Sequence, residues 1–349
     1  MLPKVSVLIA FYNSEAYLKK CMDSVLNQTL KEIEIIAVND GATDGTEALL
    51  SEYAKTDDRI IIVNQQNKGL AVSRKAALSH ASGEYISFID GDDCVDLDMY
   101  EVLYSNGIRN DLDIVQCNFY PEGDEDGWKE VENRRTYSEE VMSGDDLLAL
   151  YLNREVMPAL WQRIFRRSML AEFKAVFPVM SDHFNFPEWA AASRKVKIII
   201  KPYYHWLTRK GSLGQPMGRI HETSAKNRFV SGISILAFSK LREKKYRGGI
   251  QKYLMSYVTQ TAYHLKNSNS GKAYDNVVGI WKTLDEKLPL HENAMSLGLD
   301  EGSTKFFELL NGDSSWFREY VEGDFLGDMQ EFINGFRYNG DDLFFKTSE

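Results

Sequence analysis

Short apolar runs alternate, along residues 1–118, with stretches whose apolar positions recur every three or four residues. The runs predict β-strands and the stretches between them predict amphipathic helices. We expect strands at 5–10, 34–38, 60–63, 83–93 and 113–118. Strands that alternate with helices are typical of βαβ units. The pattern therefore predicts an α/β fold with a mostly parallel sheet.

The pattern changes after residue 118. Residues 121–146 are rich in Asp and Glu, which predicts an exposed acidic loop or insertion. Helical spacing returns at 145–153 and 158–172, an apolar strand follows at 196–200, and helical spacing dominates from about 222 into an aromatic tail at 306–345. We expect a catalytic domain at 1–220 and a mainly helical region at 221–349. Packing on a core of their own, dimerisation and membrane contact all remain open for those helices.

Composition excludes some classes of protein. A net charge of −10 argues against a nucleic-acid partner, which needs a basic surface. The three cysteines, Cys21, Cys94 and Cys117, have no CxxC spacing, which favours a reducing compartment. The N-terminus has no signal-peptide pattern, and no apolar run has the roughly 18 residues that span a bilayer. We expect a cytoplasmic protein, with attachment to the inner face of the plasma membrane left open.

Three carboxylates follow the predicted strand at residues 83–93. Asp90, Asp92 and Asp93 lie within four residues, directly after Ile86, Phe88 and Ile89. Like charges at this density are costly unless a cation lies among them, and oxygen ligands suit Mg²⁺ or Mn²⁺. Capping of the next helix explains one Asp but not three. The sequence therefore predicts a metal site where this strand ends.

Other strand ends should meet the same crevice, because the carboxyl ends of parallel strands line one edge of a sheet. Asp40 could accept hydrogen bonds from a base or ribose, or could only build its turn. Lys68 and Arg74 could contact phosphate groups, Arg74 through a bidentate fork, although Lys68 could equally be a solvated loop residue.

Four motifs carry a resemblance to a known family. The strings VSVLIAFYN, VNDGATDGT, NKGLAVSRK and GEYISFIDGDD occur in this order within about the first hundred residues. They resemble those of the inverting family 2 glycosyltransferases, which have a GT-A fold and build bacterial surface polysaccharides. Small departures from the family pattern occur at Ala10, Ser73 and Lys75.

The resemblance implies a nucleotide-sugar donor, most simply a UDP-sugar, and a Mn²⁺ or Mg²⁺ cofactor. It assigns the base and ribose to Ala10, Tyr12 and Asp40, and places Arg74 near the diphosphate or the base. Asp92 would ligate the ion, with Asp90 as its ribose-side companion. The loop residues Asn67 and Lys68 are expected to contact the donor as well.

The second half of the site is also implied by resemblance. Asp182, in the string MSDHF, stands where the family has its catalytic base, although it could instead cap a helix, with Glu188 as the fallback base. Trp161, in LWQRIFRRS, is either a sugar platform on the acceptor side or a core residue. In the string YHWLTRKGS, His205 would complete the metal shell or pack among aromatics.

Two further residues of that string, Arg209 and Ser212, would hold phosphate oxygens. The predicted function is transfer of a sugar to a glycan or a lipid-linked glycan, with inversion of configuration. A nucleotidyltransferase would require a Gly- and Lys/Arg-rich phosphate loop near the first strand, and the string VSVLIAFYN at that strand lacks one. A non-catalytic binding or scaffold protein on the same fold remains open, because Ser181 stands where the family commonly has Glu.

Overall fold

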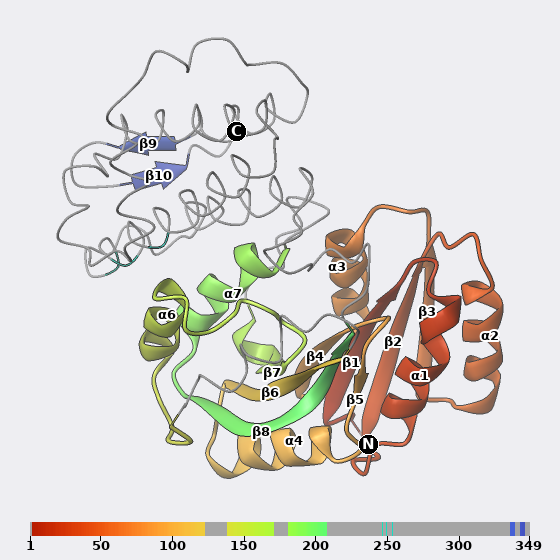
Figure 1. The fold of residues 1–349 in the computed structure, drawn as a ribbon, viewed down its shortest axis with the longest axis horizontal. Helices are drawn as coiled ribbons and strands as arrows, with labels where there is room; N and C mark the ends of the chain where they lie inside the picture. The colour runs from red at the N-terminus through yellow and green to blue at the C-terminus, as the bar shows by residue number, and fades with distance from the viewer. Residues whose placement is uncertain are drawn as a thin grey trace. The chain divides into compact units, whose positions relative to one another are not determined.

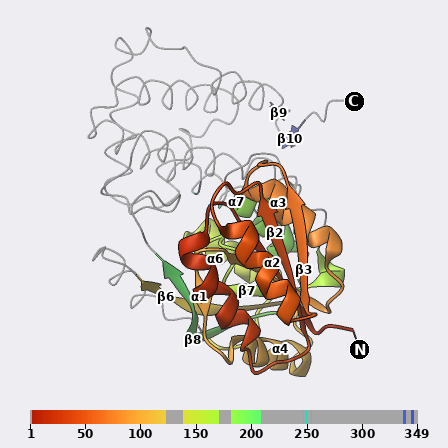
Figure 2. The same ribbon diagram turned by 90° about the vertical axis from the view of Figure 1, so that its right-hand side faces the viewer.

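The computed structural model describes residues 2–122, 138–170 and 181–207, together with 246, 249, 253, 336–338 and 343–345. Most of them belong to one compact unit, Met1–Leu148 with Met157–Ser212. Its elements, drawn in Figures 1 and 2, are β1 (Val5–Phe11), α1 (Glu15–Leu26), β2 (Ile33–Asp40), α2 (Thr46–Thr56), β3 (Ile60–Gln65), α3 (Leu70–His80), β4 (Tyr85–Asp90), β5 (Cys94–Val95), α4 (Met99–Arg109), β6 (Ile114–Glu122), α6 (Gly144–Leu152), β7 (Arg163–Arg166), α7 (Ser181–Ala192) and β8 (Val196–Leu207).

An eight-stranded sheet organises this unit, in the order β3-β2-β1-β4-β7-β6-β8-β5. The first four strands in this order run parallel, β7 pairs antiparallel with both β4 and β6, and β8 runs parallel to β6. The chain passes from β1 outward to β3 and then returns to place β4 on the other side of β1. The direction of winding therefore reverses between β1 and β4, which is where open α/β sheets bind ligands.

The two faces of the sheet bury different helices. Val7 and Ile9 of β1 share a buried core with Leu18 of α1, Leu50 of α2 and Leu103 of α4. Side chains alternate along a strand, so the intervening residues of β1 must face the other way. Helices therefore cover both faces, as Figures 1 and 2 show.

The opposite face carries α3 and α7. Phe88 of β4 stacks on Trp189 of α7, with ring centroids 6.1 Å apart, and the guanidinium of Arg74 on α3 lies 5.9 Å from the Phe88 ring centre. Residues of β1 and β4 that point to this face can therefore meet side chains from both helices.

The second compact unit, Ala149–Val156 with Leu213–Glu349, is described at few positions. The segments Phe336–Tyr338 (β9) and Leu343–Phe345 (β10) pair antiparallel, and the hydroxyls of Tyr151 and Tyr253 lie 2.6 Å apart. The predicted domain boundary at residue 220 and the predicted helices beyond 222 lie outside the described residues.

Most predicted elements of the first unit are confirmed, and the α/β fold with a mostly parallel sheet is correct. The predicted helix at 158–172 is wrong, because Arg163–Arg166 forms strand β7 and Arg167–Met169 a single 3₁₀ turn. Ile164 pairs with Ser87 of β4 and Val115 of β6, and these ladders on both sides override the local helical spacing.

Two further differences concern length. The strand predicted at 113–118 continues to Glu122, so the first two residues of the predicted acidic loop are paired; residues 123–137 of that loop lie outside the described ranges. The strand predicted at 196–200 continues to Leu207 beside β6 and β5. Among the described residues, none of the helices has the length and apolarity that a membrane span requires.

A buried carboxylate anchors the entry to β4. Glu34 of β2 is 8% exposed and accepts hydrogen bonds from the Ser82 N–H at 2.6 Å, the Gly83 N–H at 3.0 Å and the Ser6 hydroxyl. The loop before β4 is therefore held to the neighbouring strands by one side chain.

We predict that Glu34→Ala lowers the free energy of unfolding by about 2–3 kcal/mol, because several buried donors lose their acceptor together. Thermal unfolding of the purified chain measures the change. The matched control is Glu32→Ala, which removes a partly exposed, solvent-screened pair with Lys4 and should cost much less. Equal losses from the two substitutions would contradict the anchoring role of Glu34.

Candidate active site

Strand register brings the ends of β1, β2 and β4 together at one edge of the sheet. Ala10 of β1 lies opposite Val38 of β2 on one side and Asp90 of β4 on the other. Asp40 ends β2, and Tyr12, which is half-exposed, follows β1. The strand ends named in the sequence prediction therefore meet at the switch point between β1 and β4.

An ion-paired triad links three elements at this edge. Arg74 on α3 is 3% exposed, and its Nη2 donates to the Asp90 carboxylate at 2.8 Å. Its Nη1 donates to the carboxylate of Asp182, in the first turn of α7. One buried guanidinium thus holds the predicted ribose-side carboxylate and the predicted base. We call Asp90, Arg74 and Asp182 the ionic triad.

The surroundings of Asp90 and Arg74 shift the pKa values of both groups upward. The pKa of Asp90 is raised to about 6, chiefly by burial, with the negative charges of Asp92 and Asp182 adding to the rise and Arg74 opposing it. Burial disfavours the charge of Arg74, but the two carboxylates outweigh it and raise the pKa of the guanidinium. Among the described residues, three carboxylates lie around the Arg74 guanidinium at this edge, and a divalent cation would reduce their mutual repulsion.

The turn after β4 has little freedom. A Cβ on Gly91 would lie 2.6 Å from Phe11 Cδ1 and 2.7 Å from the Ala10 carbonyl oxygen, so only glycine fits between the two acidic residues. Asp92 is partly exposed, whereas Asp93 is buried. Asp92 is thus more accessible than Asp93 in this turn.

Asp93 has a structural role. Its two oxygens accept hydrogen bonds from the Tyr204 hydroxyl at 2.6 Å and the Leu207 N–H at 2.7 Å. Burial raises its pKa well above the usual range, with Asp90 and Asp92 adding to the rise. The Tyr204 hydroxyl also accepts the Asp90 N–H at 3.2 Å, so strand β8 supports the acidic turn.

Asp40 builds the neighbouring loop. It is 4% exposed and accepts hydrogen bonds from the N–H groups of Lys68 and Gly69, both at 2.9 Å, and from the Gln65 amide at 2.6 Å. The turn-building alternative for Asp40 is thus present in the structure, and its contact with a nucleotide stays a prediction. The side chains of Asn67 and Lys68 are exposed on the same loop.

The site residues predicted in the second half of the domain differ in their exposure to solvent. Asp182 is partly exposed and its Oδ2 accepts the Leu160 N–H at 3.3 Å, so the carboxylate is oriented from two directions. Glu188 is partly buried further along α7. Trp161 is buried, stacked on Tyr204 with ring centroids 4.4 Å apart, which places it in an aromatic core.

His205 lies on β8 between two carboxylates, with Nδ1 at 2.7 Å from Glu122 Oε1 and Nε2 at 2.8 Å from Asp96 Oδ1. Arg209 and Ser212 lie outside the described residues. The sequence analysis missed the roles of Tyr204, Asp96 and Glu122. Only the pairing of β8 with β5 and β6 brings them to this edge, and no local spacing signals it.

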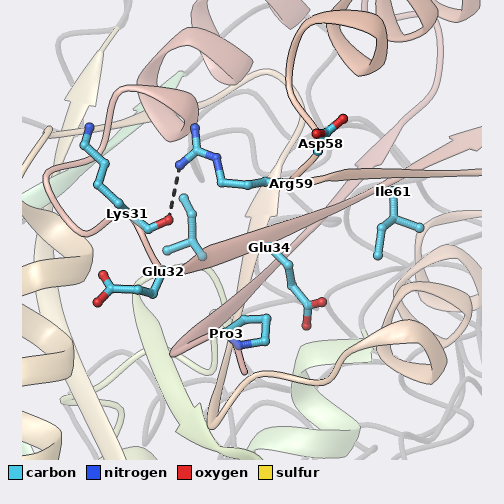
Figure 3. Close-up of a pocket in the computed structure, with 8 residues that line it drawn as sticks. Pro3, Lys31, Glu32, Glu34, Asp58, Arg59 and Ile61 are labelled. Atoms are coloured by element: carbon cyan, nitrogen blue, oxygen red, sulfur yellow. Dashed lines mark hydrogen bonds between the residues drawn. The ribbon is translucent and has the colours of Figure 1, made fainter. Parts of the chain in front are cut away.

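A pocket of about 370 Å³ lies elsewhere on the sheet (Figure 3). It is lined by Pro3, Lys31 and Glu34, and by Arg59, whose guanidinium donates to the Lys31 carbonyl at 3.5 Å. These residues adjoin the starts of β2 and β3, at the opposite edge from the ionic triad. The pocket is therefore not the crevice at the switch point.

Comparison with solved structures defines the class of fold. The Staphylococcus aureus protein TarS, residues 1–349 in complex with UDP-GlcNAc, superposes with a TM-score of 0.55 at 17% identity, covering 99% of this chain and 97% of that one. Mannosyltransferase PcManGT from Pyrobaculum calidifontis, in complex with GDP-Man and Mn²⁺, gives 0.52 at 14% identity, covering 96% and 88%. The fold is GT-A.

Sequence comparison gives the family. Residues 6–173 match Glycosyl transferase family 2. EpsH of Bacillus subtilis (strain 168) is 29% identical over 316 residues, which cover 88% of this chain and 81% of EpsH. EpsJ of the same strain is 33% identical over 227 residues, covering 61% and 63%; both are named as glycosyltransferases. The chain therefore contains a glycosyl transferase family 2 domain and is a glycosyltransferase.

We predict that Arg74→Met destabilises the fold by about 3–5 kcal/mol, because it removes a buried guanidinium from between two partly buried carboxylates that then repel each other. Adding Asp182→Asn to Arg74→Met should recover part of this loss, since one of the repelling charges disappears. Thermal unfolding of the two single variants and the double variant forms the cycle. Strictly additive effects would contradict the coupling within the triad.

We also predict a pH dependence in the metal-free protein. The folded-state pKa of Asp90, about 6, lies above the unfolded value of about 4, so folding takes up a proton between these values. The stability that protonation of Asp90 adds to the folded state is fully present below about pH 4. It is lost as the pH rises through about 6. The melting temperature of Asp90→Asn relative to the native chain should therefore rise from about pH 4.5 to pH 7 and then level off. A constant difference across this range would contradict the raised pKa.

Proposed function

We propose that this chain transfers a sugar from a UDP-sugar to a glycan or lipid-linked glycan, with inversion of configuration, in the synthesis of a bacterial surface polysaccharide. The observation that carries the proposal is the ionic triad, which joins the predicted donor side at Asp90 to the predicted base, Asp182, through Arg74. In such a reaction the nucleoside diphosphate leaves the donor while a base activates the acceptor hydroxyl. The residues that hold the donor and the base must therefore lie close together.

The donor side would bind in the crevice between β1 and β4. Ala10 and Tyr12 lie at its edge for the base and ribose, and Asp40 holds the loop that carries Asn67 and Lys68. Arg209 and Ser212 remain proposed phosphate contacts. The nucleotide-sugars bound by TarS and PcManGT, UDP-GlcNAc and GDP-Man, support a donor of this chemical type.

Asp92 and Asp90 would hold a Mn²⁺ or Mg²⁺ ion. The fit rests on the donor set, which is all oxygen, and on the burial and neighbouring carboxylates that together raise the pKa of Asp90 to about 6. PcManGT, a protein of the same fold, is in complex with GDP-Man and Mn²⁺. The ion, when bound, neutralises diphosphate charge that develops as the glycosidic bond breaks.

Asp182 would take the proton from the acceptor hydroxyl as that oxygen attacks the anomeric carbon. In this structure the Asp182 carboxylate accepts a hydrogen bond from the buried Arg74 guanidinium. A diphosphate offers Arg74 competing oxygens, so donor binding would loosen this contact and leave the carboxylate oxygen to the acceptor hydroxyl. The triad would thereby make activation of the acceptor depend on the presence of donor.

The Asp182→Asn variant tests the proposal. We expect turnover to fall by about 10²–10⁴-fold, because general-base catalysis is lost. Donor affinity should persist, since the amide side chain of the variant keeps the shape of the carboxylate. Release of UDP from a panel of UDP-sugars with Mn²⁺ measures turnover, and calorimetry measures donor binding.

Two comparisons sharpen the result. Asp92→Asn should lose metal-dependent donor binding, which Asp182→Asn should keep. Unimpaired turnover in Asp182→Asn together with a loss in Glu188→Gln would transfer the base role to Glu188. If none of the UDP-sugars binds the native chain, the assignment of a UDP-sugar donor is wrong.

A further inference from the structure

A fully buried arginine lies behind the proposed base. Arg163 of β7 is 0% exposed, and its guanidinium carbon lies 4.2 Å from the centre of the Phe186 ring on α7. Arginine side chains are almost never fully buried without partners, because the guanidinium carries five N–H donors and a permanent charge. The groups that Arg163 contacts therefore indicate which part of the site it holds in place.

Arg163 holds the loop that precedes its own strand. Its Nη1 donates to the Ala159 carbonyl, and its Nη2 donates to the Met157 carbonyl at 2.7 Å. Residues 157–159 lie outside the helices and strands, so their carbonyls need donors from elsewhere. The planar fork of one guanidinium satisfies two of these carbonyls together.

The same loop contacts Asp182. Leu160 is 0% exposed, and its N–H donates to Asp182 Oδ2 at 3.3 Å. This N–H belongs to the same peptide unit as the Ala159 carbonyl, to which Arg163 donates. Because a peptide unit is planar, fixing its carbonyl also fixes the direction of its N–H. A guanidinium on the carbonyl further polarises the peptide and strengthens the N–H as a donor.

Arg163 also contacts the helix that carries Asp182. Phe186, whose ring lies beside the guanidinium, is 0% exposed and follows Asp182 by four residues on α7. Residues at this spacing lie on the same face of a helix. One side chain thus contacts both the loop and the helix that orient the carboxylate.

We propose that Arg163 is a positioning residue for the base and acts on Asp182 through the Ala159–Leu160 peptide. The inference rests on the proposed function, in which Asp182 is the base. Arg74 donates to Oδ1 of Asp182 and the Leu160 N–H donates to Oδ2. When a diphosphate draws Arg74 away, the second contact remains. It keeps Oδ2 in place while Oδ1 receives the proton of the acceptor hydroxyl.

Arg163→Lys tests this role. Lysine keeps the positive charge but is a point donor, so it cannot hold both carbonyls in a planar fork. We expect kcat for UDP release, measured with Mn²⁺ and the UDP-sugar that the native chain turns over fastest, to fall about 10–100-fold. Small displacements of a catalytic group have effects of this size. Donor affinity, measured by calorimetry, should be unchanged.

Arg166→Lys is the matched control on the same strand. The Arg166 side chain is 18% exposed, and its guanidinium donates to the Leu112 carbonyl at 2.9 Å instead of to the loop. This variant should retain the kcat of the native chain.

A double-mutant cycle separates positioning of the base from a general structural role. Arg163→Lys is combined with Asp182→Asn, and kcat is compared in the two backgrounds. If Arg163 acts through the carboxylate, its substitution should have little further effect once that carboxylate is gone. Phe186→Leu keeps both carbonyl contacts and repeats the cycle should Arg163→Lys not fold. It should lower kcat in the native background by a smaller factor.

The outcomes distinguish this inference from the proposed function. An unchanged kcat in either variant, an equal fall in both backgrounds, or a parallel loss of donor affinity overturns the positioning role of Arg163. Unimpaired kcat in Asp182→Asn alone overturns the proposed base, and the positioning role with it. A fall in kcat in Asp182→Asn with full kcat in Arg163→Lys overturns the positioning role and leaves the base in place.

Discussion

The interaction on which the site depends is the pairing of one buried guanidinium with two carboxylates from different parts of the chain. Arg74 comes from α3, Asp90 from the end of β4 and Asp182 from the start of α7. Removing such a group from water is costly, so the three side chains must be brought together by the packing of the elements that carry them. The triad therefore ties the geometry of the donor side to the geometry of the acceptor side.

The sheet makes this pairing possible through alternation and winding order. Alternation directs Val7 and Ile9 of β1 into the core with α1, α2 and α4, while Phe88 of β4 packs on α7 at the opposite face. The reversal between β1 and β4 falls at the ends of these strands, where open α/β sheets bind ligands. Charged groups can gather at these strand ends without crossing the apolar core.

Strand β8 supports the acidic turn from the other side. Tyr204 and Leu207 satisfy Asp93, and Tyr204 also accepts the Asp90 N–H, so the orientation of Asp92 rests on a strand more than a hundred residues later. The same strand carries His205 to Cys94 and Glu122. The acidic turn and the ends of β5 and β6 thus share one supporting strand.

The sequence alone determined the βαβ order, the strand ends that carry Asp40 and Asp90, and the family, because local periodicity and short motifs are encoded by neighbouring residues. It could not determine that 163–166 would be a strand, since that depends on ladders with β4 and β6. Nor could it place Arg74 between Asp90 and Asp182, or Cys94 beside His205. Those contacts join residues that are 16, 108 and more than a hundred positions apart, and only the packing of the folded chain selects them.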